Sequence, residues 1–506
     1  MSSDASPNLV LKLTPESIDI NKNFVGRSEE IKRLSQLKNH NEAVMIVLYG
    51  RRRVGKTELL EQVFRDRQLL KFEGLENKPE EIQRQLVMNQ LARYAGDNFF
   101  KNIQTETWQD VFEWIDKFTR TGTWTIYFEE LQWLANYQED FVKYLKLAWD
   151  NWFRRNPKLV LILCGSSASF MINQVIKSKA LHNRSQYEFH LKELALGEAA
   201  KFLAKKNFTE VLDAYLTVGG IPEYLKRLNR QSSSFLSLCE ESFAPNAYFS
   251  TEYERIFISS LSENPNYKKI IELLSQQKFM TRQELLEKLD ASSGGRLTEL
   301  LEELESSGFI EKYASYHLGS EASNKLSRYG INDAYLNYFF KFIQPDLKNI
   351  QAGKYQSSLT QALSMQAYQQ YLGYAFERFC RGHAHDIAKI LNFSAVKYDA
   401  GPFYSRSLNQ ESPGFQIDLL FDRQDRVITI CEIKYRQGKI GASVIEEFEK
   451  KLEALENFLT GKNTKRPKKL NKTFHKVLVA PFGIDQALED RHYFDRVLTL
   501  DDFKNI

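Results

Sequence analysis

The sequence predicts an α/β protein whose first large domain is a parallel sheet with helices on both faces. Between Phe24 and about His190, short apolar runs alternate with longer amphipathic stretches. The runs are AVMIVLYG at 43–50, WTIYFEE at 124–130, LVLILCG at 159–165 and YEFHL at 187–191. Buried runs separated by helical segments are typical of parallel sheets, because each strand needs a crossover to reach its neighbour.

The chain is too long for one core. At about 100–200 residues per domain, its 506 residues should hold three or four domains. The pattern of apolar, polar and turn residues predicts their limits. We expect a tail at 1–20, the parallel-sheet core at 21–195, a helical lid at 196–262, a winged helix at 263–345, a polar linker at 346–365 and a C-terminal α/β domain at 366–506.

The winged-helix prediction depends on residues 266–318. They contain three helical patterns, YKKIIELLSQQ, TRQELLEKL and GGRLTELLEELESSG, followed by FIEKYASYHLG as a hairpin. Thr281 and Glu284 form a capping-box pattern at the start of the second helix. Residues 281–311 carry eight acidic side chains and only three basic ones. Phosphates would repel this surface, so we expect it to contact protein or act as part of a lid.

Composition excludes several classes of protein. Lys and Arg number 69 and Asp and Glu number 65, so the net charge is +4, far from that of a histone-like polycation. One segment, 462–476, holds seven Lys or Arg and no acid, which suits either a solvated loop or a phosphate contact. Four scattered cysteines, no signal peptide and no long apolar run predict a cytoplasmic protein without a membrane contact.

A phosphate-binding motif follows the first apolar run. Residues Gly50, Arg51, Arg52, Arg53, Val54, Gly55, Lys56 and Thr57 match G-x-x-x-x-G-K-[ST] in full, between a predicted strand and a predicted helix. The glycines let backbone N–H groups turn toward phosphates, the lysine neutralises the β- and γ-phosphates, and the threonine ligates Mg²⁺. The alternative is a Gly-rich turn with a chance lysine. We expect a P-loop that binds ATP or GTP with Mg²⁺.

Acidic and polar residues end the next strands. Glu129 and Glu130 end the run at 124–130, where a P-loop protein holds Mg²⁺ with its first acid and orients the attacking water with its second. Ser166 or Ser167 ends the following run and could sense the γ-phosphate. Arg184 could act as an arginine finger toward the nucleotide of a neighbouring subunit, which would require a homo-oligomer, or it could be a surface residue.

Five segments resemble the archaeal-type ATPases of the STAND/AAA+ group. The segments are FVGRSEEIKRL (24–34), GRRRVGKT (50–57), YFEELQWL (127–134), CGSS (164–167) and GGIPEYL (219–225). The resemblance implies an AAA+-type core that binds ATP, with Val25, Gly26 and Arg27 near the adenine base. It also implies a lid in which Gly220 and Pro222 respond to the nucleotide. Members of the group are proposed to be switched on by ATP and off by ADP.

A second group of candidate residues lies in a predicted hairpin at 415–435. If Asp422 lies opposite Ile428, paired residue numbers sum to 850 and Asp418 faces Glu432. Directly opposed Cβ atoms are about 5 Å apart, close enough for two carboxylates to share one cation. Alternation along the strand puts Lys434 on the face of Glu432. The pattern suits either a divalent-metal site or an ordinary salt bridge on a sheet face.

This D-x(13)-E-x-K pattern resembles the core of the PD-(D/E)XK nuclease superfamily. The segment GYAFERFCRG at 373–382 resembles the first helix of that core, with Glu377 pointing inward. The resemblance implies that Asp418 and Glu432 bind Mg²⁺ and that Lys434 positions the water that attacks DNA.

Together the motifs predict an ATP-dependent protein that couples its nucleotide state to a metal-dependent nuclease-like domain acting on DNA. The alternative is a nucleotide-dependent regulatory switch whose C-terminal domain binds a partner without cleaving it.

Overall fold

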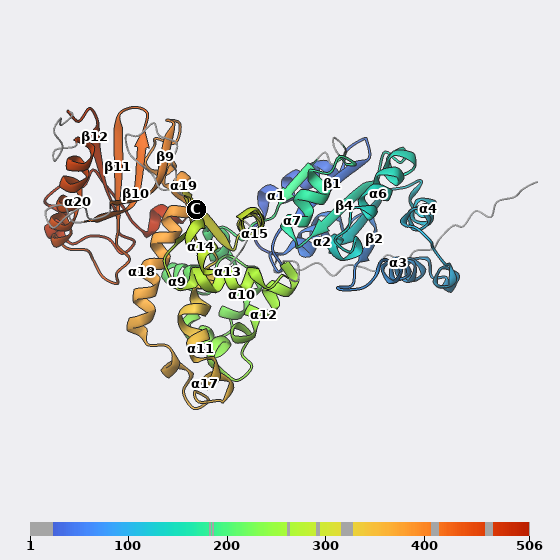
Figure 1. Ribbon diagram of the computed structural model, residues 1–506, viewed down its shortest axis with the longest axis horizontal. Coiled ribbons are helices and arrows are strands. Elements are labelled where there is room, and N and C mark those ends of the chain that lie inside the picture. The colour runs from blue at the N-terminus through green and yellow to red at the C-terminus, as the bar shows by residue number, and fades with distance from the viewer. Residues whose placement is uncertain are drawn as a thin grey trace, which may run out of the picture. The chain divides into compact units, whose positions relative to one another are not determined.

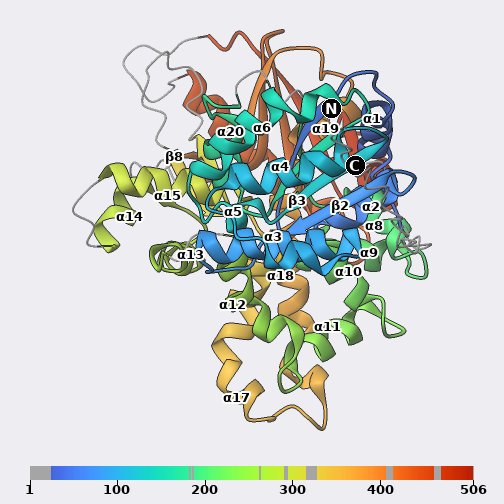
Figure 2. The ribbon, with the colours of Figure 1, turned by 90° about the vertical axis from the view of Figure 1, so that its right-hand side faces the viewer.

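The computed structural model (Figures 1 and 2) describes residues 24–181, 184, 187–260, 264–289, 294–314, 327–405, 414–460 and 469–504. The chain divides into two compact units. The first is Met1–Lys192 with Ile256–Glu263, and the second is Glu193–Arg255 with Asn264–Ile506. No helix in the described part is long and apolar enough to cross a membrane. The predicted tail at 1–20 and residues 462–468 of the basic segment 462–476 lie outside the described residues.

The first unit is built on a five-stranded parallel sheet. Its strand order is β2-β3-β4-β1-β5. The strands are β1 (Val44–Tyr49), β2 (Gln68–Glu73), β3 (Trp124–Glu129), β4 (Val160–Gly165) and β5 (Tyr187–His190). Four were predicted. The sequence analysis missed β2, because this edge strand buries only part of QLLKFE and has no continuous apolar run.

Helices connect these strands and cover both faces of the sheet (Figure 1). They are α1 (Ser28–Lys38), α2 (Lys56–Phe64), α3 (Glu80–Ala95), η1 (Asn98–Asn102), α4 (Trp108–Thr119), α5 (Leu131–Leu134), α6 (Asp140–Asn151), η2 (Phe153–Arg155), α7 (Ala168–Phe170) and η3 (Met171–Ile176).

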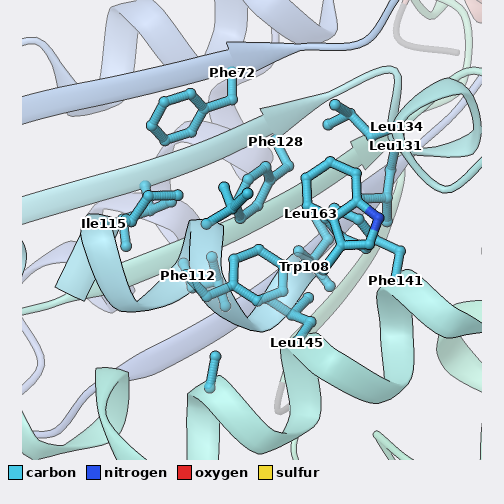
Figure 3. Close-up of a cluster of buried hydrophobic side chains, with 14 of the residues drawn as sticks. Phe72, Trp108, Phe112, Ile115, Phe128, Leu131, Leu134, Phe141, Leu145 and Leu163 are labelled. Atoms are coloured by element: carbon cyan, nitrogen blue, oxygen red, sulfur yellow. The ribbon is translucent and has the colours of Figure 1, made fainter. Parts of the chain in front are cut away.

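Two hydrophobic cores lie on opposite faces of this sheet. On one face Phe128 of β3 packs among aromatic rings of α4 and α6, and its ring centroid lies 5.5 Å from that of Phe141 (Figure 3). Trp108 meets Phe141 edge to face at 4.6 Å. The neighbouring Tyr127 points to the other core, with Leu59 of α2, since successive strand side chains alternate in direction. Both faces of β3 are therefore buried, and this burial fixes the strand that ends at Glu129.

The second unit begins with four helices and the first eight residues of a fifth, α12, whose last five residues belong to the first unit. They are α8 (Leu196–Phe202), α9 (Phe208–Val218), α10 (Pro222–Leu228), α11 (Ser234–Phe243) and α12 (Tyr248–Ser260). The GGIP segment forms the turn between α9 and α10, and Pro222 is the first residue of α10. Proline suits that position because the first helical N–H has no partner within the helix.

The described residues of 266–331, within the segment predicted as a winged helix, form three helices and a small antiparallel sheet of order β6-β8-β7. Its elements are α13 (Asn266–Ser275), β6 (Met280–Thr281), α14 (Arg282–Lys288), α15 (Gly294–Ser306), β7 (Ile310–Ala314) and β8 (Ser327–Ile331). The capping box of Thr281 and Glu284 is confirmed. The predicted hairpin partner of β7 was wrong: β7 pairs with residues 327–331, beyond the expected FIEKYASYHLG.

The C-terminal part is a mixed five-stranded sheet of order β13-β12-β11-β10-β9 (Figure 1). Strands β9, β10 and β11 are antiparallel, whereas β12 and β13 run parallel to β11. The strands are β9 (Tyr398–Ser405), β10 (Phe415–Arg423), β11 (Val427–Ile433), β12 (Thr473–Val479) and β13 (Arg496–Leu498).

Further helices precede, flank and follow this sheet, and the predicted linker 346–365 contains helical turns. They are α16 (Ala334–Tyr338), η4 (Phe339–Ile343), η5 (Gln344–Asp346), α17 (Leu347–Gln351), η6 (Leu359–Ala362), α18 (Met365–Gly382), α19 (Ala384–Ile390), α20 (Ser443–Thr460), α21 (Gln486–Glu489) and η7 (Leu500–Phe503).

Candidate functional site

The motif at 50–57 forms the loop between β1 and α2, as predicted. Gly50 cannot be replaced without rearrangement, because a Cβ there would lie 2.2 Å from the carbonyl oxygen of Leu191. Gly55 precedes α2 with φ +90°, a conformation that suits glycine. The buried Lys56 ammonium donates to the carbonyl oxygens of Gly50 and Arg51 at 2.9 and 3.0 Å. The lysine is thereby held over the loop at the amino end of α2, where anions are favoured.

Glu129 joins the loop to the neighbouring strand end. Its carboxylate accepts a hydrogen bond from the hydroxyl of Thr57 and lies 2.6 Å from the ammonium of Lys71. Burial by itself lowers the pKa of Lys71, but Glu129 and Glu61 raise it overall, so this lysine stays charged. Thr57 and Glu129 supply oxygen donors, the kind that Mg²⁺ prefers. These two side chains therefore fit the metal that accompanies a nucleotide.

Glu130 belongs to a separate hydrogen-bond network. Its Oε2 accepts from the hydroxyl of Ser166 at 2.6 Å and from Nε2 of Gln132 at 2.7 Å. Glu130 itself has φ +49°, in the left-handed region that few non-glycine residues adopt. Strained residues of this kind persist where the surroundings hold them and often lie at functional sites. Gln132 and Lys71 were not singled out from the sequence, because neither belongs to a recognised spacing.

Arg27, which lies before α1, forms hydrogen bonds with the backbone at the end of the P-loop and with the segment after β5. Its guanidinium donates to the carbonyl oxygens of Val54 and Lys192 at 2.9 and 2.7 Å. Arg27 precedes α1 with φ +62°, directly after Gly26 with φ +80°. The segment from Val25 to Arg27 is thus attached to the P-loop backbone. Contact of these residues with an adenine base stays a prediction.

Two other residues predicted to act on the nucleotide, Arg184 and Gly220, lie outside the loop at 50–57. Arg184 forms a two-pronged ion pair with Asp150, both contacts at 2.9 Å, so within this chain its guanidinium is engaged at the surface. Its role as an arginine finger stays a prediction. Gly220 lies in the second unit, where its N–H donates to Glu193 at 2.6 Å. Within the P-loop, Arg52 is exposed, whereas Arg53 is half-buried with φ +70°.

In the C-terminal sheet, β10 and β11 pair in the predicted register. Leu419 lies opposite Cys431 and Asp422 opposite Ile428, so paired numbers sum to 850. Continuing this register by one residue puts Asp418 opposite Glu432. Both carboxylates are buried, with exposed fractions of 7% and 1%. Asp418 also accepts a hydrogen bond from the backbone N–H of Ile433 at 3.3 Å.

Lysines neutralise Glu432. Its two oxygens lie 2.8 and 2.7 Å from the ammonium of Lys451 on α20, and Lys434 lies 3.1 Å from one of them. Lys434 also bonds Glu447 at 2.9 Å. The sequence analysis missed Lys451, because helical periodicity alone does not say which lysine faces a buried strand. The predicted salt bridge of Glu432 and Lys434 therefore exists, as part of a larger cluster.

Glu377 of α18 completes this group of acids. Its carboxylate lies 3.3 Å from the ammonium of Lys278 and 3.6 Å from the guanidinium of Arg381. Burial, followed by the charge of Glu377, raises the pKa of Asp418. Among the described residues, no three His, Cys, Asp or Glu side chains gather closely enough to hold a metal ion. Asp418 and Glu432 offer metal-binding oxygens, but Lys451 would have to release Glu432 first.

Family models match two parts of the chain. A model described as an ATPase domain predominantly from Archaea matches residues 24–228. Residues 24–228 are thus similar to archaeal ATPase domains, and they include the loop at 50–57 and the strand end at Glu129 and Glu130. A second model, of archaeal and bacterial proteins of unknown function, matches residues 339–451, which include Glu377, Asp418, Glu432 and Lys434.

Two proteins with similar sequences come from one archaeon. This chain is 25% identical over 421 residues to an uncharacterized protein of Methanocaldococcus jannaschii, covering 82% of this chain and 88% of the relative. A 46-residue stretch, 9% of this chain and 78% of the relative, is 46% identical to an uncharacterized ATP-binding protein of the same organism.

Two of the solved structures that resemble part of this chain are archaeal proteins, and their sequence identity to this chain is lower than that of the relatives above. The Walker-type ATPase PABY2304 of Pyrococcus abyssi has a TM-score of 0.46 and 17% identity, covering 65% of this chain and 98% of that one. The ORC2 protein of Aeropyrum pernix, in complexes with ADPNP and ADP, has a TM-score of 0.43 and 12% identity, covering 67% and 98%.

Proposed function

We propose that this ATPase couples its nucleotide state to metal-dependent cleavage of DNA by its C-terminal domain. In the first unit, Lys56 would bind the β- and γ-phosphates, and Thr57 and Glu129 would hold Mg²⁺. Glu130, kept in place by Ser166 and Gln132, would orient the water that attacks the γ-phosphate. ATP binding and hydrolysis would act as the on and off signals.

The observation that carries the nuclease proposal is the pair of buried carboxylates Asp418 and Glu432 beside Lys434, with the charge of Glu377 acting on Asp418. Asp418 and Glu432 lie on paired strands, Lys434 follows the second strand, and Glu377 projects from α18 on the side of Asp418. Two buried carboxylates with a lysine suit a metal that polarises a phosphate and activates a water. In this proposal Asp418 and Glu432 hold Mg²⁺, and Lys434 positions the water.

The test is cleavage of supercoiled plasmid DNA with Mg²⁺ or Mn²⁺, with and without ATP. We expect wild-type protein to cut, and both Asp418→Asn and Lys434→Met to abolish cutting. Glu453→Gln changes an exposed carboxylate on α20 and should cut like wild type. Intact plasmid with wild-type protein under all four conditions would sink the nuclease proposal, and so would unchanged cutting by both variants.

A second function is favoured by the lysines around Glu432. Because Lys451 and Lys434 already neutralise this buried carboxylate, the cluster is stable without a metal. The C-terminal domain would then bind a partner without cleaving it, and the protein would be a nucleotide-dependent switch. Uncut plasmid, combined with ATP hydrolysis that is lost in Lys56→Ala, would support this function instead.

A further inference from the structure

The second unit contains a cavity separate from both the P-loop and the Asp418–Glu432 pair. It has a volume of about 450 Å³, within the range of pockets that hold small ligands. Its walls come from the end of α13 and the turn after it, from strands β7, β8 and β9, from the α16–η4 segment and from one face of α18. These walls come from segments far apart in the sequence, so no motif could have indicated the cavity.

The walls are strongly cationic. The described residues that line the cavity include no Asp or Glu, while five of them are basic: Lys278, Arg328, Lys341, Arg378 and Arg381. Lys278 is paired with Glu377, 3.3 Å away. Charges of one sign around a concave surface attract ligands of the opposite sign. The cavity therefore suits an anion.

Arg381 is the cation of this group that is held deepest in the helix α18 packing, beside Glu377. Its side chain is 95% buried, since only 5% is exposed, and it lies 3.6 Å from Glu377. Its Nε and Nη1 atoms nevertheless have no hydrogen-bond partner in the described structure. Buried cations are costly unless hydrogen bonds satisfy them. These two atoms are closed to the cavity, and Glu311 lies near Arg381 and Arg378. Other atoms of Arg381, together with Arg378, line the cavity, and guanidinium groups bind phosphate in a two-pronged geometry.

Aromatic rings line the same cavity. The guanidinium of Arg328 lies 4.8 Å from the ring centre of Phe279 and 5.8 Å from that of Tyr404. Tyr371 and Tyr374 contribute further rings from α18, and the side chain of Tyr374 is 61% exposed. Aromatic and guanidinium planes stack on nucleobases irrespective of their identity. The cavity thus offers both a phosphate site and a stacking surface.

We propose that this cavity binds a nucleotide, with its phosphate on Arg381 and Arg378 and its base against the aromatic rings that line the cavity, Tyr374 among them. The ligand is either a free nucleotide or the terminal nucleotide of a nucleic-acid strand, which share this chemistry. The site is independent of the P-loop, and the proposal does not require DNA cleavage. It would give the second unit a nucleotide sensor of its own.

The experiment uses full-length protein carrying Lys56→Ala, so that the P-loop contributes little binding. Each of the four nucleoside 5′-monophosphates is measured by equilibrium dialysis, and a labelled 5′-phosphorylated ten-nucleotide single strand by fluorescence anisotropy. We expect one of these probes to bind saturably. Adding Arg381→Met should weaken its binding at least tenfold, because a charge-assisted hydrogen bond is lost. Arg491→Met, at an exposed arginine outside the cavity, should leave binding unchanged.

Tyr374→Ala is the second variant, because an exposed side chain can be removed without affecting the fold. Loss of stacking should weaken binding at least fivefold. Preference for the monophosphates identifies a free nucleotide, and preference for the strand identifies a nucleic-acid terminus. The proposal is overturned if no probe binds, or if Arg381→Met and Tyr374→Ala bind as tightly as the parent protein.

Discussion

At the scale of single residues, Glu130 combines a strained backbone with two side-chain hydrogen bonds. We expect Glu130→Gln to bind ATP normally but to hydrolyse it about 100-fold more slowly or worse, because positioned acid–base groups contribute about 10²–10⁴ in rate. Phosphate release and ATP binding are measured on the same samples. Glu106→Gln, at an exposed acid, is the control and should retain full activity. Equal hydrolysis by the two variants would contradict the role of Glu130.

The sequence predicted motif residues well and their supporting residues poorly. Lys56, Thr57 and the Asp418–Glu432 register follow from fixed spacings, since strand pairing and the P-loop turn are local features. Lys71 and Lys451 could not be predicted as partners of Glu129 and Glu432, because strands and helices distant in the sequence bring them there.

At the scale of elements, the turn between α9 and α10 depends on close backbone packing. A Cβ at Gly220 would lie 2.1 Å from the carbonyl oxygen of Leu194, whose N–H donates to the Gly220 carbonyl at 2.9 Å. We expect Gly220→Ala to destabilise the second unit by about 1–3 kcal/mol, the usual cost of overpacking. In Gly373→Ala, the nearest atom lies 3.9 Å away, so the helix α18 should become slightly more stable. Thermal unfolding followed by circular dichroism compares the two variants. Equal melting temperatures would show that the turn tolerates a side chain.

A buried acid joins α9 to the segment after β11. Asp213 accepts a hydrogen bond from the hydroxyl of Tyr435, and burial raises its pKa to about 6. The unfolded chain has the ordinary lower pKa, so folding favours the protonated acid and stability falls as pH rises through about 4 to 6. We expect Asp213→Asn nearly to match wild type at pH 3.5, below the ordinary aspartate pKa, and to exceed it at pH 7.5 by up to about 3 kcal/mol. Urea unfolding at both pH values measures this difference. A wild-type protein that gains stability relative to the variant as pH rises would contradict the assignment.

The elements themselves were predictable where burial is continuous. Strands β1, β3 and β4 are buried along most of their length and stood out as apolar runs. Strand β2 alternates between exposed and buried residues, and β8 pairs with β7 across a long gap in sequence, so both escaped notice. Local patterns carry little information about pairing over such distances.

At the scale of the whole molecule, the central question is whether the two units communicate. A net charge of +4 conceals an acidic segment at 281–311 and the cationic cavity of the second unit. A nucleic acid would therefore bind at a cationic part of the surface and not over the whole molecule. Whether ATP changes that binding must be measured on the intact chain.

Coupling between ATP and DNA makes a reciprocal prediction. In a variant that neither hydrolyses ATP nor cuts DNA, Glu130→Gln with Asp418→Asn, we expect ATP to change DNA affinity about 5- to 150-fold, the usual range of allosteric coupling. Thermodynamic linkage then requires DNA to change ATP affinity by the same factor, because both paths lead to the same ternary complex. Titration calorimetry measures both affinities. Adding Lys56→Ala should remove the effect of ATP on DNA while leaving DNA binding itself intact. If each ligand binds with the same affinity whether or not the other is present, the units act independently and the coupling proposal is wrong.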